Sequence, residues 1–171
     1  MMEKTDHLAV LFADVVESTA LYRRLGDVAA MNVIHAVLSE LKAVLPSHQG
    51  RLVKTLGDAV MCLFPDADCA VEAAVAMQHA VAGLEPGGEK MQIRIGLHTG
   101  PVVIGSDDVY GDTVNVAAYL ADAATPGQIL IAEATAKDMA QERQAAMTAI
   151  FVAMLQSTLA KTAVCEVQWR D

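Results

Sequence analysis

Two short strand-like runs joined by Gly57-Asp58 constrain the fold of this chain more than any other segment. The runs cover Arg51–Leu56 and Ala59–Phe64, and only two residues separate them. Glycine at the first of those two positions permits the backbone conformation that a tight turn requires. The pair therefore predicts an antiparallel β-hairpin that carries a carboxylate, Asp58, at its turn.

Periodicity and turn residues predict the elements before and after this hairpin. An apolar run at residues 7–14 indicates a buried strand. A short helix is expected over Ser18–Leu25, and a second helix, capped by Asp27, to about residue 45. An apolar stripe along the second helix predicts that it packs on a core. That stripe consists of Val33, Val37, Leu41 and Val44.

The remaining segments alternate between helix and strand patterns. We expect a helix over 66–84, a strand over 91–97 that bends at 98–101 and continues to 105, a helix over 111–124, a strand over 128–132, a short helix from 135, and strands near 149–155 and 163–169. This order predicts the α/β (α+β) class: a ferredoxin-like sandwich with a mainly antiparallel sheet and helices packed on it.

Length and charge limit the range of functions. The 171 residues are expected to form one domain, 1–171, and its 54% hydrophobic content is enough for a core without disulfides. No segment is expected to reach the apolar length that a membrane span needs. The formal net charge of −9 argues against nucleic-acid binding. A polyanionic ligand would need cations or a local group of Lys and Arg.

The cysteines and the amino-terminal residues favour a cytoplasmic protein. Three cysteines, Cys62, Cys69 and Cys165, follow no metal-ligand spacing and are expected to be free thiols. The first residues lack the pattern of a signal peptide.

Two carboxylates stand where strands end. Asp14 closes the first predicted strand, and Asp58 lies in the hairpin turn. If the strands are neighbours, both carboxylates project at one sheet edge and suit a hard divalent cation such as Mg²⁺. The alternative is ordinary turn chemistry, since Asp is common at strand ends and in turns.

The other candidate positions are weaker when each is taken alone. The loop 15–19 leads into a helix and can point backbone N–H groups at a phosphate, but Glu17 has the wrong charge for that task. Its alternative is a simple N-cap by Ser18 or Thr19. A lone Lys54 on a strand is typical of a solvated face. His98 is interpreted as a turn or packing residue, because no paired acid lies at catalytic spacing.

Four ordered blocks together resemble the catalytic domain of class III nucleotidyl cyclases. FADVVEST (12–19) resembles the first metal-binding motif of that family, and GRLVKTLGDAVMCLF (50–64) resembles its central hairpin. IRIGLHTGPVVIG (93–105) and DVYGDTVNVAAYLADAATPGQILI (108–131) match the next two blocks. The resemblance covers roughly residues 7–135, and beyond 140 only CEVQW (165–169) resembles the final strand of the family.

The resemblance implies a metal site and a purine site. Asp14 and Asp58, with the main-chain oxygen of Val15, would hold two Mg²⁺ or Mn²⁺ ions. Lys54 and Asp108 would recognise adenine, because an ammonium donates to N1 and a carboxylate accepts from the exocyclic amine. Asn115 would orient the ribose, and the first block would add contacts to the substrate from Phe12, Ser18 and Thr19. The implied substrate is therefore ATP rather than GTP.

The resemblance also implies that two chains share each site. One chain would supply Asp14 and Asp58, and the other would supply Lys54, Asp108 and Asn115. The partner is a second cyclase domain, so the assembly is a homodimer or a heterodimer. The reaction would yield cyclic AMP and pyrophosphate for intracellular signalling.

Three positions depart from the family pattern, and all three handle phosphate. Tyr119 stands where the family has the arginine that stabilises the transition state, and a tyrosine cannot form a charged fork. Glu17 replaces the glycine of the phosphate loop. The C-terminal lysine has no clear counterpart, and an ungapped match places Gln156 there.

Three hypotheses follow from these residues. The first is an adenylate cyclase that is slow or depends on a partner, and Asp14 and Asp58 favour it. The second is a catalytically silent, cyclase-like regulatory module, which Glu17 and Tyr119 favour. The third is a palm-like phosphoryl-transfer enzyme, against which the set of Lys54, Asp108 and Asn115 argues.

Overall fold

The computed structural model describes residues 4–139, 147–155 and 160–170, and for residues 147–155 and 160–162 it describes the backbone only. The strands form one sheet in the order β2-β3-β1-β4-β6-β8-β7, and β5 pairs with β4 beside this path. The strands are β1 (Lys4–Val15), β2 (Arg51–Leu56), β3 (Ala59–Phe64), β4 (Ile93–Ile104), β5 (Val109–Tyr110), β6 (Ile129–Ala132), β7 (Met147–Leu155) and β8 (Ala160–Val167).

All strand pairs are antiparallel except β4 and β6, which run parallel. The central strand β1 pairs with β3 on one side and with β4 on the other. Near its carboxyl end, Asp14 lies opposite Ala59 of β3 and opposite Arg94 of β4. The register of three strands therefore places Asp14 beside the β2–β3 turn. The predicted mainly antiparallel α/β sandwich is confirmed.

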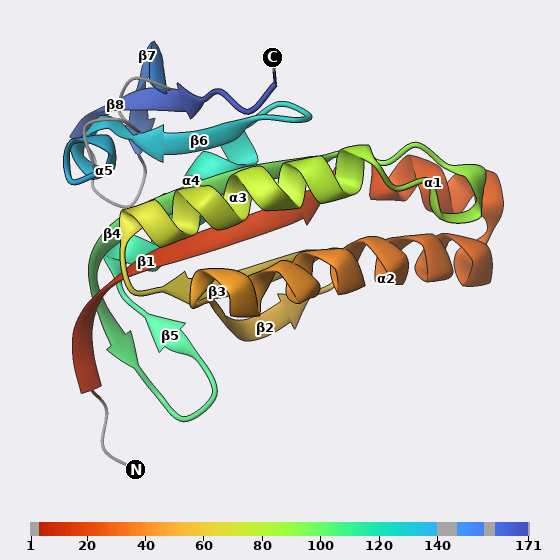
Figure 1. Ribbon diagram of the computed structural model, residues 1–171, viewed down its shortest axis with the longest axis horizontal. Coiled ribbons are helices and arrows are strands. Elements are labelled where there is room, and N and C mark those ends of the chain that lie inside the picture. Colours follow the sequence, from red (N-terminus) through yellow and green to blue (C-terminus); the bar gives the residue numbers. More distant parts are fainter. Residues whose placement is uncertain (1–3, 140–146, 156–159, 171) are drawn as a thin grey trace.

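Helices cover both faces of the sheet. The helices are α1 (Ser18–Leu25), α2 (Asp27–Val44), α3 (Ala67–Ala82), α4 (Asp112–Ala123) and α5 (Glu133–Lys137), with 3-10 turns η1 (Leu45–His48) and η2 (Pro86–Gly88). The long helices α2 and α3 lie side by side on one face, and α4 lies behind the sheet (Figure 1). At one end, β6, β8 and β7 extend the sheet beyond α3 (Figure 1).

The strand residues alternate between two buried layers. Ala9, Leu11 and Ala13 of β1 pack with the α2 and α3 side chains, while Val10 and Phe12 face the layer beneath α4. A strand places successive side chains on opposite faces, so a strand covered on both faces is apolar throughout. This explains why residues 8–13 form a continuous apolar run.

Most of the element boundaries lie within a few residues of the prediction, and three details differ. The bend expected at 98–101 does not break the strand, because β4 continues without interruption to Ile104. The short strand β5 was not predicted; two residues give too little pattern to detect. Asp27 is the first helical residue of α2, and Gly26 takes the capping position without a side-chain cap.

The helix of residues 27–48 contradicts the expectation that no segment has the apolar length of a membrane span. By length and composition it is apolar enough to cross a membrane, although no such segment was expected. Its apolar stripe contributes Val33, Val37 and Leu41 to the main core. The core helix of a folded domain passes the same test of length and hydropathy. This helix packs with α3 and the sheet in the main core.

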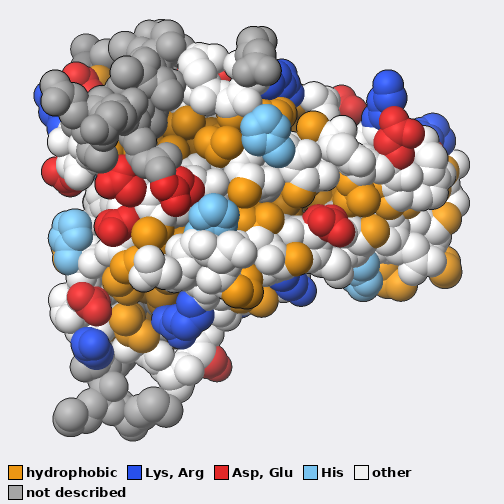
Figure 2. Space-filling model, viewed as in Figure 1, with side chains coloured by type: hydrophobic (Ala, Val, Ile, Leu, Met, Phe, Trp, Pro, Cys, Tyr) orange, Lys and Arg blue, Asp and Glu red, His pale blue; other side chains and the backbone are white. Residues whose placement is uncertain are grey.

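The face that carries α2 and α3 is mixed in character. Hydrophobic side chains are spread over these helices, and several acidic side chains gather at the left of the view (Figure 2). Lys and Arg do not gather into one basic area on the visible part of this face (Figure 2).

Candidate functional site

Asp14 and Asp58 line the same cavity at the carboxyl end of β1. The cavity has a volume of about 340 Å³ and is also lined by the loop 15–19, by Arg94 and by the turn that follows α4. The Val15 backbone N–H donates to the Asp58 carbonyl oxygen over 3.0 Å, which holds the loop against the hairpin turn. The fold therefore brings the two carboxylates to one sheet edge, as the sequence predicted.

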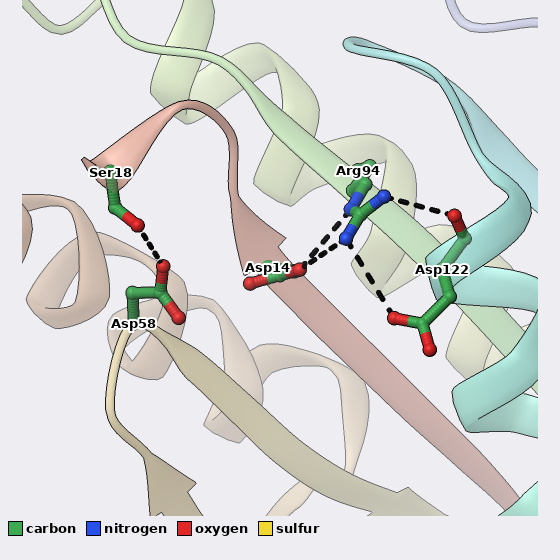
Figure 3. Close-up of polar contacts among 5 residues, drawn as sticks. All are labelled: Asp14, Ser18, Asp58, Arg94 and Asp122. Atoms are coloured by element: carbon green, nitrogen blue, oxygen red, sulfur yellow. Dashed lines mark hydrogen bonds and ion pairs between the residues drawn. The ribbon is translucent and has the colours of Figure 1, made fainter. Parts of the chain in front are cut away.

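A guanidinium occupies the space next to Asp14. Arg94 donates two hydrogen bonds to one Asp14 carboxylate oxygen, at 3.1 Å from Nε and 3.0 Å from a terminal nitrogen. Its other terminal nitrogen donates to the Asp122 main-chain oxygen over 2.9 Å, and the terminal nitrogen that binds Asp14 lies 3.7 Å from the Asp122 carboxylate. Figure 3 shows Arg94 between these two acids, with Asp58 and Ser18 on the other side of Asp14.

The electrostatics of Asp14 reflect this crowded position. Burial raises the pKa of the Asp14 carboxyl above its ordinary value, while the hydrogen bond from Arg94 lowers it; the nearby charges of Asp58 and Asp122 raise it further. Two carboxylates that repel each other at one cavity wall are stabilised by a cation between them. In the structure Arg94 supplies that positive charge to Asp14.

The loop after Asp14 adopts a conformation that suits glycine better than glutamate. Glu17 has φ 61° and ψ 32°, in the left-handed region, and occupies the capping position of α1 without a side-chain hydrogen bond. The alternative in which Ser18 or Thr19 caps the helix is wrong, because α1 begins at Ser18. Instead, the Ser18 hydroxyl donates a short hydrogen bond to the Asp58 carboxylate.

The donor set at this cavity fits a magnesium-type cation that also binds substrate phosphates. Asp14 and Asp58 offer two carboxylates, which is the number that Mg²⁺ takes from protein in many nucleotide sites. Within the described residues no group of three or more His, Cys, Asp or Glu side chains forms a complete metal site. The remaining ligands would have to come from main-chain oxygen such as that of Val15, from water and from the substrate.

Lys54 and Asp108 come together on another part of the molecule. The Lys54 ammonium lies 2.7 Å from an Asp108 carboxylate oxygen, although 54 residues separate them in sequence. The hydrogen bond from Lys54, together with that from the Val109 N–H, lowers the pKa of Asp108. Lys54 follows an irregularity in the β2–β3 register, and Asp108 precedes β5. The two residues expected to recognise the purine thus form one pair.

The helix α4 presents Asn115 and Tyr119 one turn apart. Asn115 is exposed. Tyr119 is half-buried and packs against the apolar cluster that includes Leu120, Leu130 and Val164. Asp14 lines the cavity that it shares with Asp58 and a smaller one beside Phe12, and neither of them is lined by Lys54, Asp108, Asn115 or Tyr119. A single chain therefore carries the two predicted halves of the site separately.

The other predicted contacts fall in different surroundings. Ser18 and Thr19 line the carboxylate cavity, whereas Phe12 is almost fully buried and borders a smaller hollow beside Asp14. His98 lies within β4 rather than in a turn, and its Nδ1 is 3.1 Å from the Thr135 hydroxyl. Burial lowers the pKa of His98, and the charge of Asp112 opposes this effect. Gln156 lies outside the described residues.

Sequence reasoning missed Arg94 and Asp122. Arg94 is a charged residue in the middle of the apolar run 91–97, which signals that it needs an acidic partner. The partner, Asp14, lies 80 residues earlier and is identified only once β1 and β4 are paired in register. Asp122 contacts Arg94 because α4 crosses this end of β4, which is a tertiary feature.

Comparison with known proteins agrees with this geometry. The model of the family described as "Adenylate and Guanylate cyclase catalytic domain" matches residues 1–156. An adenylate cyclase of Streptomyces coelicolor is 35% identical over 138 residues, which cover 81% of this chain and 35% of that protein. A putative adenylate cyclase 3 of Rhizobium meliloti is 34% identical over 73% of this chain and 22% of its own length. The chain thus spans about a third or less of these relatives.

Solved structures share the fold over nearly the whole chain. The catalytic core of a rhodopsin-guanylyl cyclase with converted specificity, in complex with ATPαS, has a TM-score of 0.90 at 26% identity and covers 98% of both chains. The guanylate cyclase domain of RhGC from Catenaria anguillulae, in complex with GTP, has a TM-score of 0.86 at 25% identity and covers both chains completely. The adenylyl cyclase CyaB from P. aeruginosa has a TM-score of 0.86 at 22% identity, over 98% of this chain and 96% of that one, which shows the fold alone.

Proposed function

This chain belongs to the family of adenylate and guanylate cyclase catalytic domains, and we propose that it converts ATP to 3′,5′-cyclic AMP and pyrophosphate. The observation that carries the proposal is the meeting of Asp14, Asp58 and the loop 15–19 around one cavity. Carboxylates beside a loop that opens a helix suit a cation-bound triphosphate. The adenylate cyclase names of relatives at about 35% identity point to the same activity.

Asp14 and Asp58 would hold the divalent cations, together with the main-chain oxygen of Val15. Bound Mg²⁺ or Mn²⁺ would lower the pKa of the ribose hydroxyl and neutralise charge on the triphosphate. The Ser18 hydroxyl, which donates to Asp58, orients that carboxylate. When a cation binds Asp14, the Arg94 guanidinium would turn from Asp14 toward the phosphates. Its hydrogen bond to the Asp122 main chain would keep it at the cavity wall during this change.

The Lys54–Asp108 pair supports ATP over GTP. An ammonium and a carboxylate that lie 2.7 Å apart present a donor and an acceptor side by side. Adenine offers the matching pair, an acceptor at N1 and a donor at the exocyclic amine. Guanine offers the opposite pair, a donor at N1 and an acceptor at O6, which would face like groups. The same separation lets the two side chains pair with each other when no purine is bound.

The active unit would be a dimer in which two chains complete each site. In one chain, Asp14 and Asp58 line one cavity. The Lys54–Asp108 pair and Asn115 lie elsewhere on the same chain. A second cyclase domain that brings its Lys54–Asp108 pair to this cavity would assemble the full set. A homodimer has two such sites, and a heterodimer with another cyclase chain would be able to supply the arginine that Tyr119 replaces.

The reaction then needs positioning more than covalent chemistry. The ribose 3′-oxygen attacks the α-phosphorus in line, the new O–P bond closes the ring, and the bond to pyrophosphate breaks while the hydroxyl proton leaves to solvent. Asn115 would orient the ribose for this approach, and both reacting groups belong to one molecule, which limits the entropy cost. Tyr119 would donate at most one neutral hydrogen bond to the α-phosphate.

A silent regulatory module is the second candidate, and two observations favour it. Tyr119 packs against an apolar cluster, so it is poorly placed to replace a phosphate-binding arginine. Glu17 adds a negative charge in the loop that would face the triphosphate. Such a module would bind ATP with a divalent cation and turn it over slowly or not at all.

Cyclic nucleotide formation by the purified protein separates these candidates. The assay compares ATP with GTP, and Mg²⁺ with Mn²⁺. Asp58→Ala is the inactive reference. Glu40→Ala, which removes an exposed acid from α2, is the matched control with the same change in charge.

Cyclic AMP above the Asp58→Ala level, unchanged in Glu40→Ala, would establish an adenylate cyclase. Cation-dependent ATP binding without product would favour the regulatory module or half of a heterodimer. Absence of both binding and product would refute the proposal.

A further inference from the structure

A second cavity lies beside the segment that leads into β4 and shares no lining residue with the carboxylate cavity. It has a volume of about 400 Å³, within the range of small-molecule sites. Its walls come from the end of α3, the loop that leads into β4, the turn before β6, and the segment after β8. The lining residues used below are Gln78, Leu84, Lys90, Met91, Trp169 and Arg170.

One wall of this cavity is fixed in place by three separate contacts. The Trp169 indole N–H donates to the Gly127 main-chain oxygen over 2.7 Å. Its ring meets His79 edge to face, with the ring centres 5.1 Å apart. The Arg170 guanidinium lies over the same indole at 4.5 Å from the ring centre. The aromatic wall and one cation are therefore positioned before any ligand arrives, which reduces the entropy cost of binding.

Gln78 supplies a hydrogen-bond acceptor to the lining of the cavity. Its side chain is only 3% exposed, and its amide nitrogen donates to the main-chain oxygens of Ile93 and Gln128, at 3.2 and 3.3 Å. These bonds use the two amide hydrogens and fix the orientation of the group. Gln78 lines the cavity, and with both amide hydrogens engaged its side-chain oxygen remains as the acceptor that a ligand N–H or O–H group can use.

The rim carries two cations that lack acidic partners within the described part of the chain. Lys90 is exposed and forms no ion pair there, and the Arg170 guanidinium lies over the indole and beside Gly127. Glu85 also lines the cavity and contributes one negative charge, so the rim is positive by one charge. In a chain with a formal net charge of −9, a positive cavity rim is a local exception that favours an anion.

From this arrangement we infer a binding site for a small amphipathic organic anion, with a carboxylate at one end and a hydrogen-bond donor at the other. The carboxylate pairs with Lys90 and Arg170, the apolar body lies between Trp169 and the side chains of Leu84 and Met91, and the donor reaches the Gln78 side-chain oxygen. A free inorganic anion would leave the apolar wall and the Gln78 side-chain oxygen unused.

This site is separate from the proposed cyclase site. No residue lines both cavities among those the structure describes. They are neighbours through one backbone contact, because the Gln92 main-chain oxygen accepts from the Val16 N–H of the loop after Asp14, over 3.0 Å. The inference does not depend on whether the chain cyclises ATP, so failure of either proposal leaves the other standing.

The single tryptophan of the chain, Trp169, gives a direct test. Its fluorescence is followed while 4-hydroxybenzoate, which carries a carboxylate, a ring and a hydroxyl donor, is added to the intact protein. We expect a saturable change with a dissociation constant of about 1 mM, as befits a ligand of this size. Benzoate lacks the donor and 4-hydroxybenzyl alcohol lacks the anion, so both are expected to bind several-fold more weakly.

Substitutions on the rim locate the binding. Lys90→Gln and Arg170→Gln are each expected to weaken 4-hydroxybenzoate binding about threefold, the effect of losing one exposed charge pair. Lys42→Gln on α2 removes an exposed lysine remote from the cavity and is the matched control. Because Arg170 contacts the indole, its variant is also titrated calorimetrically.

The outcomes are decisive in both directions. Saturable binding that weakens in both rim variants, but not in Lys42→Gln, supports the site. Absence of saturation by fluorescence and calorimetry overturns it. Equal binding of all three probes also overturns it, because neither the charge nor the donor would then be recognised. Binding of unchanged affinity in Lys90→Gln and Arg170→Gln overturns it as well.

Discussion

At the scale of single residues, the backbone at Glu17 conflicts with the side chain that it carries. A residue with a Cβ in the left-handed region is strained by about 1 kcal/mol, and the same region costs glycine nothing. Glu17→Gly is therefore expected to raise the free energy of unfolding by about 0.5 to 1 kcal/mol, measured by denaturant titration. It should also tighten ATP binding about threefold, because a negative charge leaves the phosphate loop.

The chain offers a matched control for this change. Gln49 has the same left-handed conformation, with φ 57°, at the end of η1. Gln49→Gly should yield a similar gain in stability and leave ATP binding unchanged. A gain in ATP affinity in both variants would show that the effect comes from stability alone.

Asp14 illustrates a cost that a functional carboxylate imposes on stability. Its pKa in the folded chain lies above the ordinary 3.8, chiefly because of burial. An acid with a raised pKa binds more protons folded than unfolded, so stability falls as pH rises from 3.8 through the folded pKa. Asp14→Asn keeps an oxygen for Arg94 but carries no charge.

We expect Asp14→Asn to unfold at a higher temperature than the native chain at pH 7. The difference should shrink as the pH falls through the folded pKa of Asp14 and be lost below about 3.8, where the native carboxyl is protonated in both states. Thermal unfolding followed by circular dichroism across this pH range is the measurement. An Asp14→Asn chain that is less stable at neutral pH would mean that the Arg94 pair outweighs the cost of burial.

Tyr119 combines a packing role with the loss of a phosphate ligand. It is half-buried against Leu120, Leu130 and Val164. Tyr119→Arg should raise the cyclisation rate by up to about 100-fold, since a charged donor to a developing phosphate charge is worth roughly that factor. Tyr119→Phe keeps the packing and loses only the hydroxyl, so its rate should fall by at most about tenfold, the value of one neutral hydrogen bond. A Tyr119→Arg rate that stays unchanged would place the defect at Glu17.

At the scale of elements, the close contact between the α4 backbone and β4 depends on Gly96. A Cβ on Gly96 would lie 2.1 Å from the Ala121 backbone nitrogen and 2.7 Å from the Ala117 carbonyl oxygen. Backbone atoms of a helix cannot give way singly, so Gly96→Ala would push α4 off the sheet. Because α4 carries Asn115, Tyr119 and Asp122, this spacing sets the position of three site residues at once.

Gly96→Ala is expected to lower the free energy of unfolding by about 2 kcal/mol or more, the effect of overpacking a tight interface. Gly83→Ala is the matched control, because its added Cβ meets only ordinary contacts, at 3.7 Å or more, and its φ is −91°. Urea denaturation of both variants provides the comparison. Equal stability of Gly96→Ala and the native chain would contradict the close packing.

At the scale of the whole molecule, the two halves of the proposed site lie apart on one chain. Asp14→Ala would keep an intact Lys54–Asp108 pair, and Lys54→Ala would keep an intact carboxylate cavity. If the active unit is a homodimer, half of the dimers in an equal mixture are mixed, and each has one intact site of two. The mixture should therefore recover about one quarter of the native activity, measured as cyclic AMP formed.

A mixture of Asp14→Ala with Asp58→Ala is the negative control, since both changes damage the same half. It should remain inactive at every ratio. Recovery in this control, or none in the first mixture despite an active native chain, would rule out the shared site.

The sequence by itself determined the order and bounds of most elements, because each depends on local periodicity and turn residues. Arg51–Leu56 and Ala59–Phe64 flank a glycine turn, and the apolar stripe of α2 identifies its core face. The four ordered blocks also identified the family, which the family model confirms over residues 1–156. The sequence also predicted that Asp14 and Asp58 lie together, because the end of the first strand and the hairpin turn meet at one sheet edge when these strands are neighbours.

Only the tertiary structure decided which distant side chains meet. The pairs Arg94–Asp14 and Lys54–Asp108 join residues 80 and 54 positions apart. The burial of Tyr119 and the cavity around Trp169 likewise arise where separate segments pack. Strand register and helix docking fix such contacts, and both depend on the summed packing of the whole core, which no local pattern contains.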